Sequence, residues 1–345
     1  TEKNNMKRIL PSYPLWIIDP NFSVWSPCDE LNGGDTLFWT GLSRRTYGFV
    51  RANGTTYCLL GRRDGARQLK QTDVSVSAFG THYTFEGDGF TLKVDFVSPL
   101  LPNDLKRLSC PVCYTEYEAS FEGEVPADFS VAIALDEEYC YNNENAKTVG
   151  GVLPLNGYEA AFMTRLRNLV MSNADDIAAP DWGDVYLTGE EAFFVTDAAL
   201  NEYIFAGEAK YVRKDRERNY LFAVSKSPKG YFMTAFDDKV SIFYFGEWLK
   251  GYYFRKGKTI IDALNESRKN HDDILAQCAA FDKKLKEDCE KVGKDYYTLA
   301  CAALRQSVGA HKLVENAKGD LLYLSKEGDS DGCIGTADVS YPSIP

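Results

Sequence analysis

Histidine is scarce in this sequence, and long apolar runs are missing. The three histidines, His82, His271 and His311, lack the spacing that would bring two imidazoles to one metal ion. We therefore expect no metal ion and no other cofactor. No stretch of about 18 apolar residues is present, and residues 1–5 are polar, so we expect neither a membrane span nor a targeting segment within the chain.

Two catalytic motifs are absent as well. Ser-x-x-Lys does not occur, which argues against the serine nucleophile of β-lactamase-like enzymes, and no G-x-x-x-x-G-K-[ST] loop is present to hold nucleotide phosphates. A match to the G-x-S-x-G nucleophile elbow occurs at 328–332. Only thirteen residues follow it, none of them histidine, so a Gly-rich turn is the better interpretation.

The nine cysteines are scattered from Cys28 to Cys333 and are too sparse for a disulfide scaffold. Most are expected to be buried thiols. Cys110 and Cys113 have the C-x-x-C spacing, but residues three apart on a strand point to opposite faces. A plain strand is therefore favoured over a redox or zinc site.

Negative charge exceeds positive charge: 50 Asp and Glu residues stand against 39 Lys and Arg residues, a net charge of −11. A field of this sign repels phosphate backbones, so nucleic acid is not an expected partner. The 44% hydrophobic and 13% aromatic content is typical of a folded, β-rich protein.

From about residue 15 to residue 251 the apolar pattern alternates with period two. Phe90, Leu92, Val94 and Phe96 are an example, and such a pattern predicts half-buried strands. Asn53-Gly54 predicts a type I′ hairpin turn. More than ten such segments, with no helix-length pattern between them, predict large antiparallel sheets packed face to face.

The pattern changes to a helical one near residue 258. Thr259 and Asp262 indicate a helix start, and the amphipathic run ends at Gly293. Its early part at 267–273 is polar and could form a solvent-bridging turn. A second helix is predicted at about 294–315, followed by a short strand at 321–324 and a polar loop. His311, on this helix, is expected to be a satisfied buried residue.

Two helices cannot bury both of their own apolar faces. We therefore expect the chain to be truncated and to pack on a C-terminal helical domain that is missing from it.

Carboxylates cluster in the loop that follows the short strand, at Glu327, Asp329, Asp331 and Asp338. Paired carboxylates can protonate a leaving group and activate water, which hydrolysis of an amide or a glycoside requires. A solvated turn stays open as an alternative. Tryptophans could likewise stack on sugars or simply fill the core; they are Trp16, Trp25, Trp39, Trp182 and Trp248.

Several stretches together resemble the glutaminase A family, and they run in the family's order over nearly the whole chain. They are 19–26, 38–41, 96–102, 181–187, 244–246, 304–306, 310–313, 324–327 and 334–342. The resemblance implies a mainly β protein, with a β-supersandwich of two large antiparallel sheets followed by the first helices of an incomplete six-hairpin α/α-barrel. The expected domains are 1–258, including an N-terminal family segment at about 10–70, and 259–345.

The chain also departs from the family pattern at three places. Ile18 stands where members tend to have His, Leu37-Phe38 where they tend to have Arg-His, and Asp331-Gly332 where Asn-Gly is usual. These changes predict a different specificity if the positions touch substrate.

The resemblance implies L-glutamine hydrolysis, with the loop at 326–338 lining a pocket for a small-molecule substrate at the mouth of the barrel. We assign Asp338 as a carboxylate acid or base, Glu327 as its partner, and Lys326 as the group that stabilises the developing oxyanion. The expected substrate contacts are Asp331, Trp39 and Trp25. The alternatives are a glycoside hydrolase on the same fold and a non-catalytic binding or scaffolding module. The resemblance further implies a bacterial protein in the periplasm or outside the cell.

Overall fold

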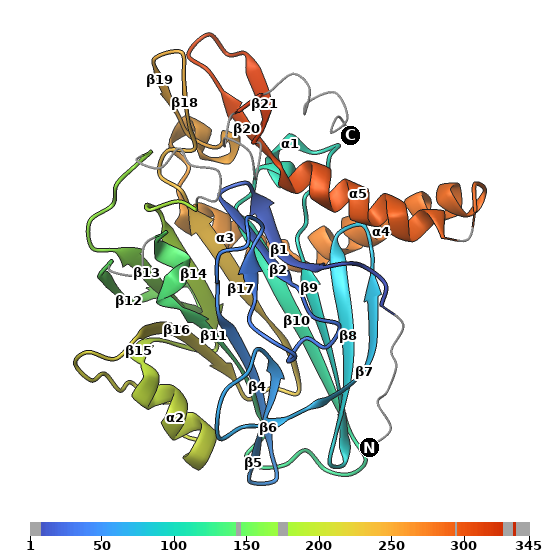
Figure 1. Cartoon of the computed structure of the whole chain (residues 1–345), viewed down its shortest axis with the longest axis vertical. Helices are drawn as coiled ribbons and strands as arrows, with labels where there is room; N and C mark the ends of the chain where they lie inside the picture. Colours follow the sequence, from blue (N-terminus) through green and yellow to red (C-terminus); the bar gives the residue numbers. More distant parts are fainter. Residues whose placement is uncertain (1–7, 143–145, 172–178, 294, 327–333, 336–345) are drawn as a thin grey trace.

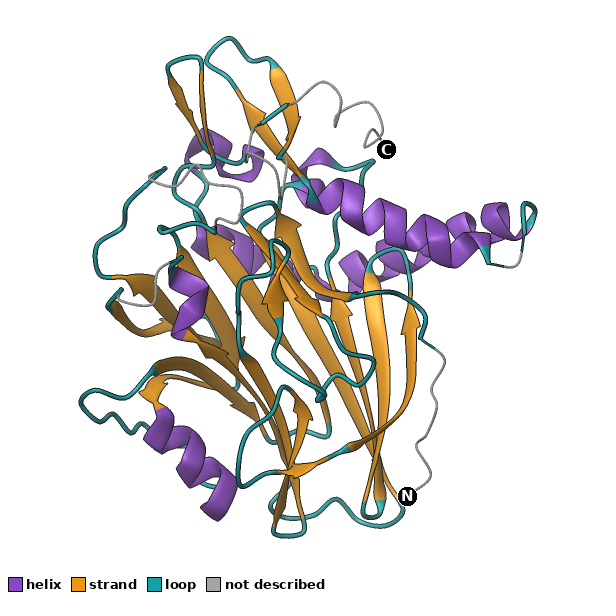
Figure 2. Ribbon diagram, in the orientation of Figure 1, coloured by secondary structure: helices purple, strands orange, loops and turns teal. Residues whose placement is uncertain are grey.

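Two large antiparallel sheets pack face to face, and helices follow them along the chain (Figures 1 and 2). The computed structural model describes residues 8–142, 146–171, 179–293, 295–326 and 334–335. The prediction of a mainly β protein with two large sheets, followed by helices, is confirmed.

The larger sheet has eight strands. In spatial order they are β12 (Thr148–Leu155), β13 (Tyr158–Arg165), β14 (Asp184–Gly189), β17 (Lys229–Asp237), β10 (Val112–Phe121), β9 (Phe90–Val97), β8 (Gly80–Gly87) and β7 (Lys70–Val76). The predicted alternation holds in β9, where Phe90, Leu92, Val94 and Phe96 are all buried.

The second sheet has six strands. They are β15 (Glu191–Thr196), β16 (Asn219–Ser225), β11 (Ser130–Asp136), β4 (Thr46–Ala52), β5 (Thr55–Leu60) and β6 (Arg67–Gln68), with only the short β5–β6 pair parallel. Asn53 and Gly54 join β4 to β5 with φ angles of 51° and 76°, as a type I′ turn requires.

The main core lies between the sheets. Phe85 and Leu92 from the larger sheet share one hydrophobic cluster with Ile133 and Leu135 from β11. The other side of β11 is also buried, because Ala132 and Ala134 belong to a separate cluster with the helix α2. On that side Tyr203 of α2 packs against the rings of Phe49 and Phe222.

Helices cover the outer faces of both sheets. The helix α2 (Asp197–Ala206) packs on the six-stranded sheet through Leu200 and Tyr203. The helices α3 (Ile260–Lys269) and α4 (His271–Glu290) pack on the eight-stranded sheet through residues such as Leu264 and Ile274. The predicted start of α3 is confirmed, because Thr259 and Asp262 form a capping box.

Smaller elements gather at one end of the molecule. A three-stranded sheet of β1 (Tyr13–Asp19), β2 (Phe22–Ser26) and β3 (Leu37–Phe38) lies against α5 (Tyr296–Gly309), as Figure 1 shows. Two hairpins lie beyond it and share a cluster, β18 (Ile242–Tyr244) with β19 (Glu247–Leu249) and β20 (His311–Glu315) with β21 (Leu321–Ser325). The remaining short helices are α1 (Leu105–Leu108), η1 (Glu137–Cys140) and η2 (Tyr252–Gly257).

Of three predictions about helices, two are wrong in detail. The ten-residue helix α2 lies inside the region predicted to have no helix of that length. The first predicted helix is interrupted at Asn270, within the polar stretch for which a turn was considered, and forms α3 and α4. The second ends at Gly309, because residues 311–315 pair with 321–325 as a hairpin.

The cysteine predictions agree with the structure. The eight cysteines that it describes are unpaired thiols, and all but Cys28 are buried. Cys110 Sγ lies 3.6 Å from Ser267 Oγ, whereas Cys113 Sγ donates to the carbonyl oxygen of Ile17 at 3.4 Å. The two sulfurs therefore face different neighbours, as expected for a plain strand.

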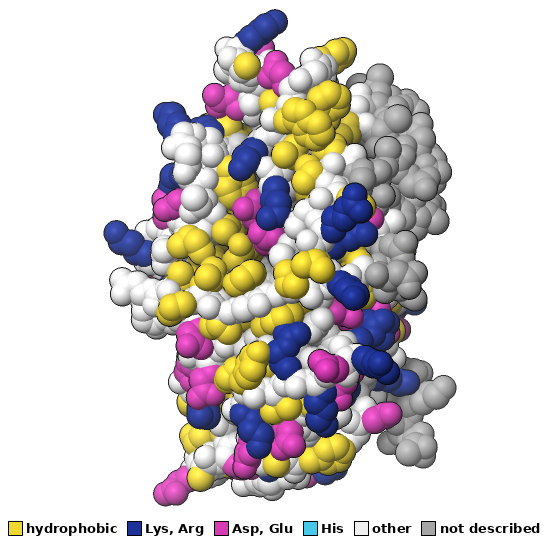
Figure 3. Space-filling view, turned by 90° about the vertical axis from the view of Figure 1, so that its left-hand side faces the viewer, with side chains coloured by type: hydrophobic (Ala, Val, Ile, Leu, Met, Phe, Trp, Pro, Cys, Tyr) yellow, Lys and Arg dark blue, Asp and Glu magenta, His cyan; other side chains and the backbone are white. Residues whose placement is uncertain are grey.

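The surface mixes charges of both signs. In the side view of Figure 3, acidic and basic side chains are interspersed among hydrophobic ones, so no field of one sign dominates that face. Among the described helices, none combines the length and the apolar character needed to cross a bilayer.

Candidate functional site

A pocket of about 450 Å³ lies where the three-stranded sheet meets the C-terminal end of α5. Its lining comes from both ends of the described chain. The residues are Ser12, Ser23, Trp25, Leu37, Phe38, Trp39 and Gly41 from the N-terminal segment, and Gln306, Gly309 and Ala310 from α5 and the residue after it. The volume and the mixture of aromatic and polar side chains suit a small organic ligand.

Hydrogen bonds fix both tryptophans of the pocket. Trp25 Nε1 donates to Ser23 Oγ at 2.9 Å, and Trp39 Nε1 donates to the carbonyl oxygen of Pro20 at 2.9 Å. The ring of Phe38 contacts that of Trp39 edge to face, with centroids 6.2 Å apart. Because the indole N–H groups are satisfied by the protein, the rings can offer apolar surface to a ligand.

Lys326 lies beside this pocket. Its backbone N–H donates to the carbonyl oxygen of Ala310 at 2.9 Å, and its Nζ lies 5.8 Å from the ring centroid of Trp39. Burial lowers the pKa of the Lys326 ammonium. Among the described residues no carboxylate offsets the effect of burial on this ammonium, which could therefore receive an anionic group of a ligand.

Of the six residues predicted for the site, the structure brings three together, which are Lys326, Trp39 and Trp25. Glu327, Asp331 and Asp338 lie outside the described residues, so their predicted roles stay predictions.

The sequence did not single out Gln306, Ser23 or Ala310, which also line the pocket. All three fall within stretches of family resemblance, and that signal could have found them.

Two positions at which the chain departs from the family pattern, Leu37 and Phe38, line the same pocket. Ile18 does not, because it is packed in the core between the sheets. His311 is buried as expected, although on β20 rather than a helix. Its Nδ1–H donates to the carbonyl oxygen of Ser307 at 2.6 Å, and its ring stacks on Tyr323.

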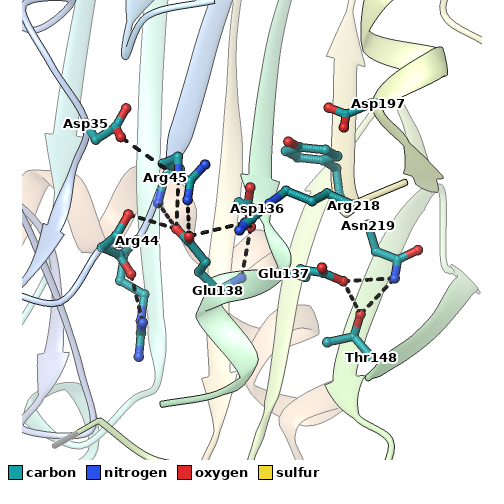
Figure 4. Close-up of polar contacts among 12 residues, drawn as sticks. Asp35, Arg44, Arg45, Asp136, Glu137, Glu138, Thr148, Asp197, Arg218 and Asn219 are labelled. Atoms are coloured by element: carbon teal, nitrogen blue, oxygen red, sulfur yellow. Dashed lines mark hydrogen bonds and ion pairs between the residues drawn. The ribbon is translucent and has the colours of Figure 1, made fainter. Parts of the chain in front are cut away.

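A second polar cluster lies at the end of β11 (Figure 4). Arg218 Nη1 lies 2.7 Å from Asp136 Oδ1 and 3.2 Å from Glu138 Oε1, and Glu138 also pairs with Arg45. Burial and the charge of Glu138 raise the pKa of Asp136 to about 6. Burial would raise the pKa of Glu138 too, but hydrogen bonds from Ser43 and Arg45 hold it below its ordinary value.

Such a split of two neighbouring carboxyl pKa values occurs in acid/base pairs of enzymes. Here Asp136 has no exposed surface and Glu138 is only 4% exposed, so a substrate cannot reach either of them. The cluster is better understood as a structural link between β11, β4 and β16 than as a catalytic pair.

Candidate metal ligands do not converge in the described residues. No group of three or more His, Cys, Asp or Glu side chains is placed there to hold an ion. Asp19 and Asp238 lie close together, but the ammonium of Lys312 already forms ion pairs with both carboxylates and takes the place that a metal ion would need.

Comparison with known proteins gives matches along most of the chain. Residues 80–288 match the domain of unknown function DUF5127, residues 1–69 match the domain of unknown function DUF4964, and residues 293–345 match the glutaminase A six helical-hairpin domain. Glutaminase A of Aspergillus oryzae is 25% identical over 384 aligned positions, which cover 97% of this chain and 53% of the relative. The chain therefore spans about half the length of that relative.

Proposed function

Because this chain belongs to the glutaminase A family, we propose that it is part of a hydrolase that converts L-glutamine to L-glutamate and ammonia. The observation that carries the proposal is the position of the Lys326 ammonium, 5.8 Å from the ring centroid of Trp39 at a pocket lined from both ends of the chain. At 25% identity to the Aspergillus oryzae enzyme, the reaction itself stays a proposal.

Hydrolysis of the glutamine amide requires a general base, a general acid and a positively charged group near the carbonyl oxygen. A carboxylate removes a proton from water, the water oxygen bonds to the amide carbon, and the carbonyl oxygen becomes an oxyanion. The C–N bond then breaks, and a protonated carboxyl group gives its proton to the leaving nitrogen. Asp338 and Glu327 are the proposed acid/base carboxylates, and the poorly solvated Lys326 ammonium is the proposed partner of the oxyanion.

The substrate would lie against the tryptophans. The apolar methylenes of glutamine suit the faces of Trp39 and Trp25, and the Gln306 amide can exchange hydrogen bonds with a polar group of the ligand. Asp331 is proposed as a further substrate contact through the substrate's ammonium group.

A glycoside hydrolase is the second candidate, because two tryptophans line one pocket, and indole rings are common platforms for sugars. Glycosidases also use two carboxylates. A third candidate is a non-catalytic binding module. Ligand screening of the natural polypeptide separates them: turnover of oligosaccharides favours the second, and binding without turnover of either substrate favours the third.

The test is release of ammonia and glutamate from L-glutamine by the whole natural polypeptide that contains this sequence. We expect Lys326→Met to lower kcat about 100-fold or more, as loss of an oxyanion partner does. Lys318→Met is the matched control, since Lys318 lies on the exposed turn of the same β20–β21 hairpin. No turnover by the natural protein, or unchanged turnover in both Lys326→Met and Asp338→Asn, would contradict the proposal.

Two further points stay proposals. The division into domains near residue 258 is supported by the change from strands ending at Leu249 to helices beginning at Ile260, and limited proteolysis at that junction tests it. The periplasmic or extracellular location is supported by family resemblance, and fractionation of the source cells tests it.

A further inference from the structure

Lys312 is a buried cation that joins three distant parts of the chain. Its Nζ forms ion pairs with Asp19, the last residue of β1, and with Asp238, directly after β17, the latter at 2.7 Å. The side chains of Lys312, Asp19 and Asp238 are only 11%, 7% and 2% exposed. Asn21 Nδ2 also donates to Asp238 Oδ2 at 3.0 Å. The N-terminal strand β1 and the C-terminal strand β20 are thus held to the end of β17, an interior strand of the larger sheet.

Burial opposes charge in this cluster, and its effect differs among the members: the ion pairs favour charged Lys312 and Asp238, whereas burial raises the pKa of Asp19 above its ordinary value. Burial would lower the pKa of Lys312, but the charges of Asp19 and Asp238 raise it above its ordinary value. Burial would raise the pKa of Asp238, but the Lys312 ammonium keeps it below its ordinary value. Burying three charges is unfavourable, and well-packed apolar side chains often stabilise a fold as well or better. Stability alone is therefore a weak reason for this lysine.

Asp19 connects the cluster to Trp39 through hydrogen bonds. Asp19 Oδ1 accepts a hydrogen bond from the backbone N–H of Asn21 at 2.8 Å, which fixes the turn between β1 and β2. Pro20, inside that turn, accepts the hydrogen bond from Trp39 Nε1. The orientation of the indole therefore depends on a turn that Asp19 anchors.

Lys312 is connected to Lys326 through the β20–β21 hairpin. Lys312 lies on β20 and pairs with Leu324 of β21. Ala310, directly before β20, lines the pocket and accepts the backbone hydrogen bond of Lys326. The strand that carries Lys312 therefore also sets the backbone position of Lys326.

We propose that Lys312 is a positioning residue, which holds the Trp39 indole and the Lys326 ammonium in fixed relative positions beside the pocket through its ion pairs with Asp19 and Asp238. A role of Lys312 in catalysis rests on the proposed function, because it requires that this pocket is the active site.

The test is the indole N–H signal of Trp39 in ¹⁵N NMR spectra of the protein. The chain has five tryptophans, and Trp39→Phe assigns the signal. In Lys312→Met we expect the Trp39 signal to shift and its hydrogen exchange to speed up by about tenfold or more, because the turn that accepts its hydrogen bond is freed. The Trp16 signal serves as an internal reference, since Trp16 Nε1 donates to Thr115 Oγ1 in the core at 3.0 Å.

Arg63→Met is the matched control. It breaks a partly buried ion pair with Asp197, at 2.7 Å, on the distant helix α2. We expect it to lower the unfolding temperature without moving the Trp39 signal. If Lys312 only stabilised the fold, Lys312→Met and Arg63→Met would both leave the Trp39 signal unchanged.

Asp19→Asn decides the question if Lys312→Met fails to fold, because it keeps the shape of the side chain and removes only one charge. A Trp39 signal and exchange rate like those of the wild type in every folded variant of Lys312 and Asp19 would overturn the inference. The indole signal needs no turnover. A wild type that leaves L-glutamine intact would therefore overturn the proposed function and leave this inference standing.

Discussion

Gly309, the last residue of α5, packs directly on Ile17 of β1. A Cβ atom at position 309 would lie 2.6 Å from Ile17 Cγ2, closer than carbon atoms can approach. The absence of a side chain therefore sets the distance between the helix and the N-terminal strand. Since Gly309 also lines the pocket, the same contact limits the size of the site.

Gly309→Ala is expected to push α5 away from β1. Ile17 is branched at Cβ and has little freedom to turn aside, so we expect a loss of about 1–3 kcal/mol in the free energy of unfolding, measured by urea denaturation. Gly293→Ala is the control, because a Cβ there would meet no atom within 4 Å, and its stability should be nearly unchanged. Equal stability of both variants and the wild type would show that the contact is not tight.

His271 is expected to make stability depend on pH. Its Nε2 lies 2.7 Å from Glu116 Oε1 on the larger sheet, and its Nδ1 lies 2.8 Å from Asp272 Oδ1. Burial opposes the charged ring, but Glu116 and then Asp272 raise the pKa of His271 above its ordinary value. Tyr231 stacks on the ring, and Tyr114 meets it edge to face.

Because the folded-state pKa is raised, the stabilisation is complete below the ordinary pKa of histidine, 6.5, and is lost as pH rises through the higher folded value. Unfolding of the wild type and His271→Gln is therefore compared from about pH 6 to about pH 9. The advantage of the wild type should shrink over this range. A constant difference between the two would rule out titration of His271 as a link between α4 and the sheet.

Asp136 should change stability in the same direction as His271, but at more acidic pH. Its pKa is raised from 3.8 to about 6, so the folded protein binds a proton more tightly than the unfolded chain between these values. Ionisation of Asp136 therefore destabilises the fold as pH rises from about 4 to about 7, by on the order of 2–3 kcal/mol.

The measurement is the difference in unfolding free energy between the wild type and Asp136→Asn across that range. The wild type should lose stability relative to the variant as pH rises. A difference that grows in favour of the wild type would mean that Arg218, 2.7 Å away, holds the carboxylate charged instead.

Local patterns predicted the strands well, because alternating burial and hairpin turns depend on residues that are neighbours in the sequence. Alternation in Phe90–Val97 and the positive φ angles of Asn53-Gly54 are set by near neighbours. The helix α2 was missed because Phe205 and Ala206 place apolar residues on its exposed side, which leaves only a weak helical periodicity in the sequence.

The second predicted helix was too long for a related reason. Leu313 and Val314 continue the apolar spacing of α5, and only pairing with Tyr323 and Leu322 shows that they belong to a strand. Whether such a segment forms a helix or a strand depends on the later segment with which it pairs. The periodicity of the segment alone carries no information about that pairing.

The sequence singled out two residues that lie close together in the structure, but it did not show what holds them there. Trp39 and Lys326 were singled out as residue types that suit a hydrolytic pocket, and the structure places them together. The links that hold them there, from Asp19 and Asp238 to Lys312, join residues far apart in sequence and follow no local pattern.

The most direct test of the site is a crystal structure of the natural polypeptide with the product L-glutamate bound. We predict density for the ligand in the pocket of Trp25 and Trp39, with a carboxylate oxygen within hydrogen-bond distance of Lys326 Nζ and the methylenes against the Trp39 ring. Density for L-glutamate at another place, with this pocket empty, would contradict the assignment of the active site.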